Sequence, residues 1–275
     1  MRIAVLQMTS GIDPVANAAT LVAGLEEAAR GGARMAFTPE MTGLLDRDRK
    51  RAAGAIVGEG EDQVLAAARA AAARLGLWVQ LGSLALRPGG AETRYVNRGF
   101  LIDDAGAIRA RYDKLHLFDV DLPTGESWRE SAAYAPGTGA VVAETPAGRL
   151  GLSICYDMRF PDLYRALSDA GAEILAAPAA FTVPTGQAHW HILLRARAIE
   201  AGCFVIAAAQ TGTHADGRAT YGHSLVIDPW GAVLLDMGDA PGVGFAEIDL
   251  ASLHDIRARI PALKHRRPIP EVART

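Results

Sequence analysis

The sequence predicts an α/β protein built as a four-layer α-β-β-α sandwich, in which two mixed sheets stack on each other and helices cover both outer faces. Two observations support this fold class. Short apolar strands alternate with amphipathic helices, and the same order of elements occurs twice along the chain. The strands are apolar enough to be buried on both faces. Two sheets that each have helices on one face can bury their other faces most easily by stacking on each other. A single doubly wound sheet is the alternative.

The first half begins with a short apolar strand and a helix that starts at a proline and stops at Gly31-Gly32. A second helix leads into a hairpin whose turn, Asp-Asp-Ala-Gly, has the residues that turns favour. The predicted elements are a strand at 3–7, a helix at 14–30, a strand at 35–38, a helix at about 61–75, a strand at 78–81 and a turn at 103–106.

The second half repeats this order and ends in a hairpin with the turn Asp-Pro-Trp-Gly. The predicted elements are a strand at 150–154, a helix at 161–170, a strand at 174–177, a helix at 189–201, a strand at 204–209 and a turn at 228–231.

Traces of duplication remain in the residues themselves. The hairpin at 102–108 matches the one at 227–233, and the helix-to-strand junctions near Gly76 and Gly202 keep a nearly equal offset. The stretch after about residue 253 lies outside the repeat. We interpret it as an arm that packs on a partner subunit, with a solvated basic tail as the alternative.

Composition excludes several classes of protein. With 275 residues and no linker-like run, residues 1–275 are predicted to form one domain, and 50% hydrophobic against 21% charged residues favours a folded core. A net charge of -3 without a long basic cluster argues against nucleic-acid binding. No segment reaches the roughly 18 apolar residues that span a bilayer, and the apolar N-terminal run is too short for a signal peptide, so we expect a cytoplasmic protein that does not bind membranes.

Cys155 is the first candidate for chemistry. It follows an apolar strand and precedes Pro161, which suits the first turn of a helix. Such a turn exposes a thiol, and the start of the helix is expected to lower its pKa and bind an oxyanion. The alternative is a small core residue, which is how we interpret Cys203 inside its apolar strand.

Glu40 also follows a predicted strand, at the sheet edge where open α/β sheets bind ligands. Lys114 comes after the returning strand of the first hairpin. Taken singly, each is interpreted as a solvated loop residue. The two cysteines have no Cys-x-x-Cys spacing, and His189 and His191 are two apart, which does not suit shared ligation on a helix, so neither a metal nor another cofactor is predicted.

Together these segments resemble the three catalytic motifs of the nitrilase, or carbon–nitrogen hydrolase, superfamily. Phe-Thr-Pro-Glu at 37–40 is similar to the glutamate motif, Tyr-Asp-Lys-Leu-His-Leu at 112–117 to the lysine motif, and Gly-Leu-Ser-Ile-Cys-Tyr-Asp-Met-Arg-Phe-Pro at 151–161 to the cysteine motif. The resemblance covers essentially the whole chain. It implies the α-β-β-α sandwich and homodimers or higher homo-oligomers that associate through the helix after the nucleophile and the C-terminal arm.

The resemblance also implies a mechanism with a thioester intermediate. Cys155 is the nucleophile, and Glu40 takes its proton, passes it to departing ammonia and then activates water. Lys114 and the backbone N–H of Tyr156 hold the oxyanion, and the charge of Lys114 favours the thiolate. A second glutamate that orients the lysine is assigned to Glu130, with Glu126 as the competitor.

Later segments resemble the deaminated glutathione amidase and omega-amidase branch most. The expected substrate is the amide of a small keto acid, with Arg159 binding its carboxylate and Phe181 and Thr185, on the loop after a strand, closing the pocket. An omega-amidase acting on α-ketoglutaramate, a nitrilase and an N-carbamoyl amino-acid amidohydrolase are the alternative enzymes. A binding module or a thiol redox sensor is disfavoured, because the three catalytic groups are present and no resolving cysteine lies near Cys155.

Overall fold

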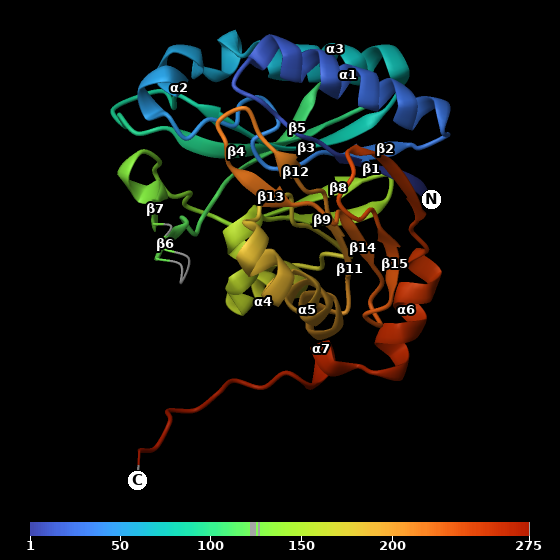
Figure 1. Cartoon of the computed structure of the whole chain (residues 1–275). Helices are drawn as coiled ribbons and strands as arrows, with labels where there is room; N and C mark the ends of the chain where they lie inside the picture. The colour runs from blue at the N-terminus through green and yellow to red at the C-terminus, as the bar shows by residue number, and fades with distance from the viewer. Residues whose placement is uncertain (122–124, 126, 275) are drawn as a thin grey trace.

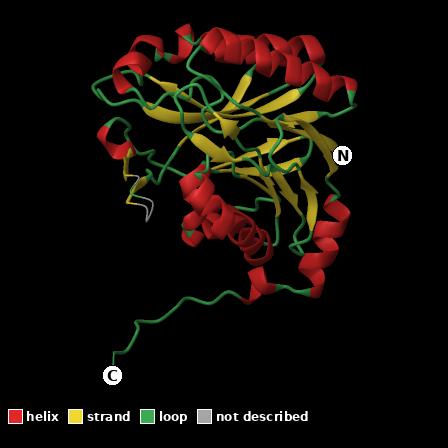
Figure 2. Ribbon diagram, in the orientation of Figure 1, coloured by secondary structure: helices red, strands yellow, loops and turns green. Residues whose placement is uncertain are grey.

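The computed structural model describes residues 1–121, 125 and 127–274. It is an α/β fold with helices on both sides of two central sheets (Figures 1 and 2). The helices are Pro14–Arg30 (α1), Arg49–Ala55 (α2), Gln63–Leu75 (α3), Pro161–Asp169 (α4), Val183–Ala201 (α5), Leu250–Arg259 (α6) and Ala262–His265 (α7), and 3-10 turns lie at Glu59–Glu61, Glu130–Ala132 and Cys155–Arg159.

The two sheets have matching topologies. The first, in spatial order, contains β16 (Gly242–Glu247), β1 (Arg2–Gln7), β2 (Met35–Phe37), β3 (Trp78–Leu86), β4 (Val96–Ile102) and β5 (Ile108–Asp113). The second contains β8 (Val141–Thr145), β9 (Gly148–Leu152), β10 (Ile174–Ala176), β11 (Phe204–Ala207), β14 (Leu225–Ile227) and β15 (Val233–Asp236). In each sheet three parallel strands, β1-β2-β3 or β9-β10-β11, are flanked by antiparallel neighbours. The predicted duplication is therefore visible in the topology.

Alternating side chains of the strands build two separate cores. In β1, Ile3 and Val5 belong to the core shared with the second sheet, whereas Ala4 and Leu6 pack under α1 and α3. This period of two is what a strand buried on both faces requires. Figure 1 shows the resulting layers: α1 and α3 above the first sheet, α4 and α5 below the second. The sandwich predicted from the sequence is confirmed.

Turn chemistry repeats between the halves as well. The carboxylate of Asp103 accepts from the N–H groups of the residues two and four positions later, at 3.0 and 2.8 Å, and that of Asp228 does the same at 2.9 and 2.8 Å. Gly76 and Gly202 both end their helix with a left-handed conformation, with φ of 60° and 55°. These are the positions that the sequence comparison of the halves had paired.

Some predicted boundaries were wrong. The helix predicted at 189–201 begins at Val183, because Pro184 fits the first turn of a helix. Glycine is required at position 186, where this helix meets the ring of Tyr221, since an added Cβ would lie 2.2 Å from that ring. Thr185 therefore lies in the first turn of α5 and not in a loop. Helix α2 was not predicted. Its N-cap, Asp48, accepts from the Lys50 and Arg51 N–H groups.

Small sheets and the C-terminal region complete the fold. The pairs β6 (Asp119–Asp121) with β7 (Ser127–Arg129) and β12 (Thr211–Thr213) with β13 (Ala219–Tyr221) are antiparallel hairpins. Helix α6 packs on the body through Leu253, which is fully buried, and the stretch after α7 leads away from it (Figure 1). Among the residues that the structure describes, no helix is both long and apolar enough to cross a bilayer.

Candidate active site

Glu40 lies in a turn at the carboxyl end of β2, and this turn is fixed to β3. The Thr38 hydroxyl accepts from the Gly82 N–H at 2.9 Å, and the Thr42 N–H donates to the Ser83 carbonyl at 3.0 Å. Glu40 is 4% exposed, and its Oε2 accepts from the Ala180 N–H at 2.9 Å. Ala180 comes from the second half of the chain, so the carboxylate is held where the two sheets meet.

Lys114 directly follows β5 and reaches the same carboxylate. Its Nζ donates to Glu40 Oε1 at 2.9 Å and to Glu130 Oε2 and Oε1 at 2.9 and 3.2 Å, and the residue is only 2% exposed. The Phe118 N–H holds Glu130 Oε2 at 2.6 Å. The structure thus brings Glu130 to Lys114, as the sequence analysis predicts; the competing Glu126 lies outside the described residues.

Cys155 opens the 3-10 turn after β9 instead of directly preceding an α-helix. Its φ is 47°, a strained value for a residue with a side chain, and its N–H donates to the Pro178 carbonyl at 2.8 Å. Residues that hold such a conformation are often found at functional sites. The residue is buried, with 7% exposed at the cavity wall.

Asp157 ties this turn to the segment that carries Lys114. Its carboxylate is fully buried and accepts from the Ile154 N–H at 2.9 Å, the Tyr112 hydroxyl at 2.7 Å and the His116 N–H at 3.0 Å. The nucleophile turn and the lysine segment are therefore locked to each other. This explains why Asp157, Tyr112 and His116 flank the two candidate residues in sequence.

The thiol of Cys155 and the carboxylate of Glu40 face the same cavity, and the charges around this pair set the protonation of both groups. Burial raises the pKa of the Glu40 carboxyl, but the charge and hydrogen bond of Lys114 outweigh it and hold that pKa below its usual value. The pKa of the Cys155 thiol is raised well above 9.0 by burial and by the negative charge of Glu40, against which Lys114 acts only in part. At neutral pH the site therefore holds a neutral thiol beside an ionised carboxylate.

This corrects one prediction. From the helix start and the charge of Lys114 we expected a lowered pKa for Cys155. The structure gives the opposite direction, because burial and the adjacent Glu40 carboxylate both disfavour the thiolate.

Asn97, on β4, is a site residue that sequence reasoning missed. Its Nδ2 donates to Glu40 Oε1 at 2.9 Å and to Glu130 Oε1 at 3.3 Å, so it bridges both carboxylates on either side of Lys114. It is 1% exposed. A polar amide near the start of a strand that ends in the apolar run Phe-Leu-Ile was the available signal.

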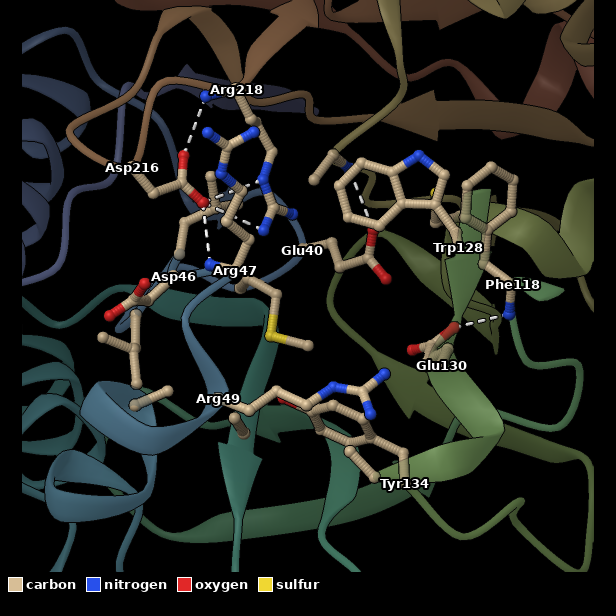
Figure 3. Close-up of a pocket in the computed structure, with 18 of the residues that line it drawn as sticks. Glu40, Asp46, Arg47, Arg49, Phe118, Trp128, Glu130, Tyr134, Asp216 and Arg218 are labelled. Atoms are coloured by element: carbon tan, nitrogen blue, oxygen red, sulfur yellow. Dashed lines mark hydrogen bonds and ion pairs between the residues drawn. The ribbon is translucent and has the colours of Figure 1, made fainter. Parts of the chain in front are cut away.

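These residues lie at a cavity of about 840 Å³. In the view of Figure 3, Glu40 lies between the ring of Trp128 on one side and Arg47, Asp216 and Arg218 on the other. The Arg218 guanidinium lies 4.8 Å from the Trp128 ring centroid and pairs with Asp216 at 3.0 Å. Arginines dominate the charges of the outer wall, which is lined by Arg47, Arg49, Arg51, Arg129 and Arg218 together with Asp46, Asp48 and Asp216.

The predicted substrate-binding residues are only partly brought together. Phe181 and Thr185 line the cavity, while Arg159 is not among its lining residues. The Arg159 guanidinium instead lies 5.4 Å from the Phe181 ring centroid and 3.3 Å from His189 Nδ1. Tyr156 follows Cys155 in the 3-10 turn, where its ring packs edge-on against Phe118 and Phe160.

Comparison with known proteins places this site in a family. The family model described as carbon-nitrogen hydrolase matches residues 2–258. The deaminated glutathione amidase of Bos taurus is 43% identical over 97% of this chain and 82% of its own length. The NitFhit protein of C. elegans superposes with a TM-score of 0.89 and 40% identity over 97% of this chain, which spans only 65% of that longer protein.

A third relative carries information on the nucleophile. The amidase from Nesterenkonia sp. AN1 superposes with a TM-score of 0.78 and 27% identity, covering 95% of this chain and 98% of its own, and a glutamate-to-glutamine variant of that enzyme has acrylamide added to its active-site cysteine. From the extent of these matches, this chain belongs to the carbon–nitrogen hydrolase family and is a hydrolase of carbon–nitrogen bonds other than peptide bonds.

Proposed function

We propose that this protein is an amidase that cleaves a keto-acid amide such as deaminated glutathione, with Cys155 as its nucleophile. One observation carries the proposal: Glu40 and Lys114 form a buried hydrogen-bonded pair and line, together with Cys155, a cavity large enough for a small substrate. An amide is a poor electrophile with a poor leaving group, so its cleavage needs a nucleophile, a proton carrier and an oxyanion site together.

In the first half-reaction, Glu40 removes the proton of Cys155 as the sulfur attacks the amide carbonyl. The ionised carboxylate and the neutral thiol are the protonation states from which this transfer starts. Glu40 then gives the proton to the departing nitrogen and the C–N bond breaks. The product is a thioester on Cys155; the amine is ammonia for a primary amide and cysteinylglycine for deaminated glutathione.

In the second half-reaction, Glu40 removes a proton from water, which attacks the thioester carbonyl. The C–S bond breaks, the acid leaves and the proton returns to the Cys155 sulfur. One carboxylate serves both steps because its position, held by Lys114, Asn97 and the Ala180 N–H, does not depend on either substrate.

Oxyanion stabilisation is assigned to the Lys114 ammonium and the Tyr156 N–H. Glu130 supports the position of Lys114 through its two oxygens. Burial lowers the pKa of Lys114, but the carboxylates of Glu130 and Glu40 raise it well above its usual value, so the ammonium stays charged throughout the reaction. No metal ion or cofactor has a part in this mechanism.

The substrate assignment rests on charge at two ends of the site. Deaminated glutathione carries one carboxylate on its keto-acid end and a second on its leaving group, whereas α-ketoglutaramate carries only the first. We assign the keto-acid end to the cavity wall formed by Phe181 and Thr185, with Arg159 against the Phe181 ring as the cation nearest to that wall, and the distal carboxylate to the arginine-rich outer wall around Arg47. The name of the Bos taurus relative supports the same substrate.

The experiment compares kcat/KM for deaminated glutathione, α-ketoglutaramate, glutamine, N-carbamoyl-β-alanine and a simple nitrile, with products separated by chromatography. Deaminated glutathione is expected to give the highest value. A preference for α-ketoglutaramate would reassign the chain to the omega-amidases, and turnover of only the carbamoyl compound or the nitrile would overturn the proposal.

Two arginine variants locate the carboxylates. Arg159→Lys keeps the charge but loses bidentate geometry, so kcat/KM should fall about tenfold to a hundredfold for both keto-acid amides and stay level for a neutral amide of matched length.

Arg47→Gln should lower kcat/KM for deaminated glutathione by less than about tenfold, since Arg47 is exposed, and leave kcat/KM for α-ketoglutaramate unchanged. Equal losses for charged and neutral amides would show that these residues support the site only structurally.

We further propose that the protein is a homodimer or higher oligomer and works in the cytoplasm. Both of its cysteines are free, and a thiol nucleophile persists best in a reducing compartment. Large apolar side chains exposed on α5 and on the β14–β15 turn support the oligomer.

A further inference from the structure

The geometry points to a second site in this protein, a binding site for a zinc-class divalent cation formed by His191, His223 and Asp236. Their ligand atoms all lie within 4.8 Å of one another. His191 Nε2 is 3.0 Å from Asp236 Oδ2, and His223 Nδ1 is 2.8 Å from Asp236 Oδ1. None of the three lines the cavity at Cys155, so this site is separate from the amidase chemistry.

The three residues come from different elements that converge on one point. His191 is on α5, His223 is in the segment between β13 and β14, and Asp236 ends β15. Sequence spacing therefore gives no metal-binding motif, and the pair that the sequence analysis rejected, His189 and His191, is not the pair proposed here. A cation at this point would join α5 to the edge of the second sheet.

The backbone holds His223 in a strained conformation. Among the described residues, the non-glycine positions with positive φ are Met41, Cys155 and His223, and the first two lie next to or at the catalytic centre. The His223 N–H donates to the Gly238 carbonyl at 2.6 Å, and its carbonyl accepts from Trp190 Nε1 at 2.7 Å. Such strain persists only where the surroundings enforce it, and it is typical of binding and catalytic positions.

Neighbouring groups also fix the side chains. The His223 ring stacks on the Tyr221 ring with centroids 4.5 Å apart, and the His191 ring stands edge-on to the His223 ring with centroids 5.2 Å apart. The Gly238 N–H donates to Asp236 Oδ1 at 3.0 Å. The side chains of His191, His223 and Asp236 remain 33%, 27% and 35% exposed, so a hydrated ion can reach them. The site is preorganised and open to solvent at once.

Ligand chemistry selects the class of cation. Two imidazole nitrogens and one carboxylate oxygen suit Zn²⁺, which often takes three protein ligands and one water, whereas Mg²⁺ and Ca²⁺ prefer oxygen. Tetrahedral bonds of about 2.0–2.1 Å place ligand atoms roughly 3.3 Å apart, close to the two histidine–aspartate separations of 3.0 and 2.8 Å. Each neutral imidazole binds by carrying its proton on the other ring nitrogen, so no further reactant is needed.

The test titrates the full chain with ZnCl2 in a calorimeter and repeats the titration with MgCl2. Variants His191→Gln and Asp236→Asn remove one ligand each, His254→Gln removes an exposed histidine elsewhere, and Cys155→Ala removes the thiol most able to compete for zinc. We expect one Zn²⁺ per chain, at least about tenfold weaker binding in the two ligand variants, and unchanged binding in the other two. Co²⁺ should give a visible absorption band that His191→Gln abolishes.

Three outcomes would overturn the site: no stoichiometric binding, equal binding by wild type and both ligand variants, or binding that disappears in Cys155→Ala. The first would show that Asp236 forms only hydrogen bonds with the two imidazoles. The melting temperature of each variant, and the turnover of every variant except Cys155→Ala, confirm that it is folded, and EDTA should leave wild-type turnover unchanged because the site takes no part in catalysis.

Discussion

Cys155 and Glu40 share one proton between them, and the protonation of this pair determines how the enzyme responds to pH. Because the pKa of Glu40 is lowered, its carboxylate stays ionised as pH falls until the lowered value is reached. Because the pKa values of Cys155 and Lys114 are raised, the thiol and the ammonium both persist into alkaline solution. The competent protonation state therefore covers a wide range of pH.

We accordingly expect kcat/KM to stay level between about pH 5 and about pH 9, with an acid limb below the ordinary carboxyl range. The measurement is a pH profile with a neutral amide, so that substrate ionisation does not contribute. A limb with an apparent pKa near 7 would contradict this account, since it would require a base other than Glu40 or a thiolate formed at rest.

The two cysteines provide a second test at the scale of single residues. Burial raises the pKa of both thiols, so access distinguishes them: Cys203 is fully buried in the junction between α5 and β11, whereas Cys155 opens to the cavity with a base beside it. Iodoacetamide should therefore label Cys155 first, and Cys203→Ala should keep activity while Cys155→Ala loses it with the fold intact. Equal labelling of both thiols, or turnover by Cys155→Ala, would remove the case for this nucleophile.

At the scale of elements, the turn after β2 positions Glu40 through its close contact with β3. A Cβ at Gly82 would lie 2.2 Å from the carbonyl oxygens of Thr38 and Pro39, so the two backbones meet only because residue 82 is glycine. Gly82→Ala must push this turn away and displace Glu40. We expect a loss of about 1–3 kcal/mol in stability and a clear fall in kcat.

Thermal unfolding and kinetics of Gly82→Ala check this, with Gly54→Ala as the matched control. A Cβ at Gly54 on α2 meets nothing within 4 Å, and alanine there should be neutral or stabilise by about 0.5–1 kcal/mol. Wild-type melting temperature and kcat in Gly82→Ala would contradict the proposed role of this contact.

Elements were predictable from the sequence wherever periodicity and turn residues agreed. Helix α1 has a capping aspartate, a first-turn proline and a terminal glycine, and its predicted bounds are those observed. The start of α5 was not predictable, since the reason for Gly186 is the ring of Tyr221, a contact remote in sequence. The role of Asn97 and the raised pKa of Cys155 were not predictable for a similar reason, because both depend on which charged groups the fold buries together.

The whole molecule presents an apolar surface on the outer side of its second sheet. Ile192 and Ile199 on α5 are 70% and 53% exposed, and Trp230, in the turn before β15, is 57% exposed. The same side carries α4 and α7, and the C-terminal stretch leads away from α7 (Figures 1 and 2). Large exposed apolar groups of this kind mark association surfaces.

We expect this surface to bind a second copy of the chain. Light scattering after size-exclusion chromatography should give at least twice the 29.0 kDa of one chain, and Ile192→Asp together with Trp230→Asp should shift the mass toward that of the monomer. Val15→Asp, a substitution of an exposed apolar residue on the opposite layer, is the control. A monomeric wild type would contradict the oligomer.

The central claim is a thioester on Cys155, and quenched-flow mass spectrometry of the Cys155 peptide tests it most directly. Deaminated glutathione and α-ketoglutaramate share the same acyl part, so both should add the same mass to Cys155. The adduct should appear at short times in wild type, and should form more slowly but persist longer in Glu40→Gln, which lacks the base for both half-reactions. Cys155→Ala should show no adduct and no product. If acid formed in wild type while the Cys155 peptide stayed unmodified in every sample, or if the acyl group appeared on Cys203, the proposed covalent mechanism would be wrong.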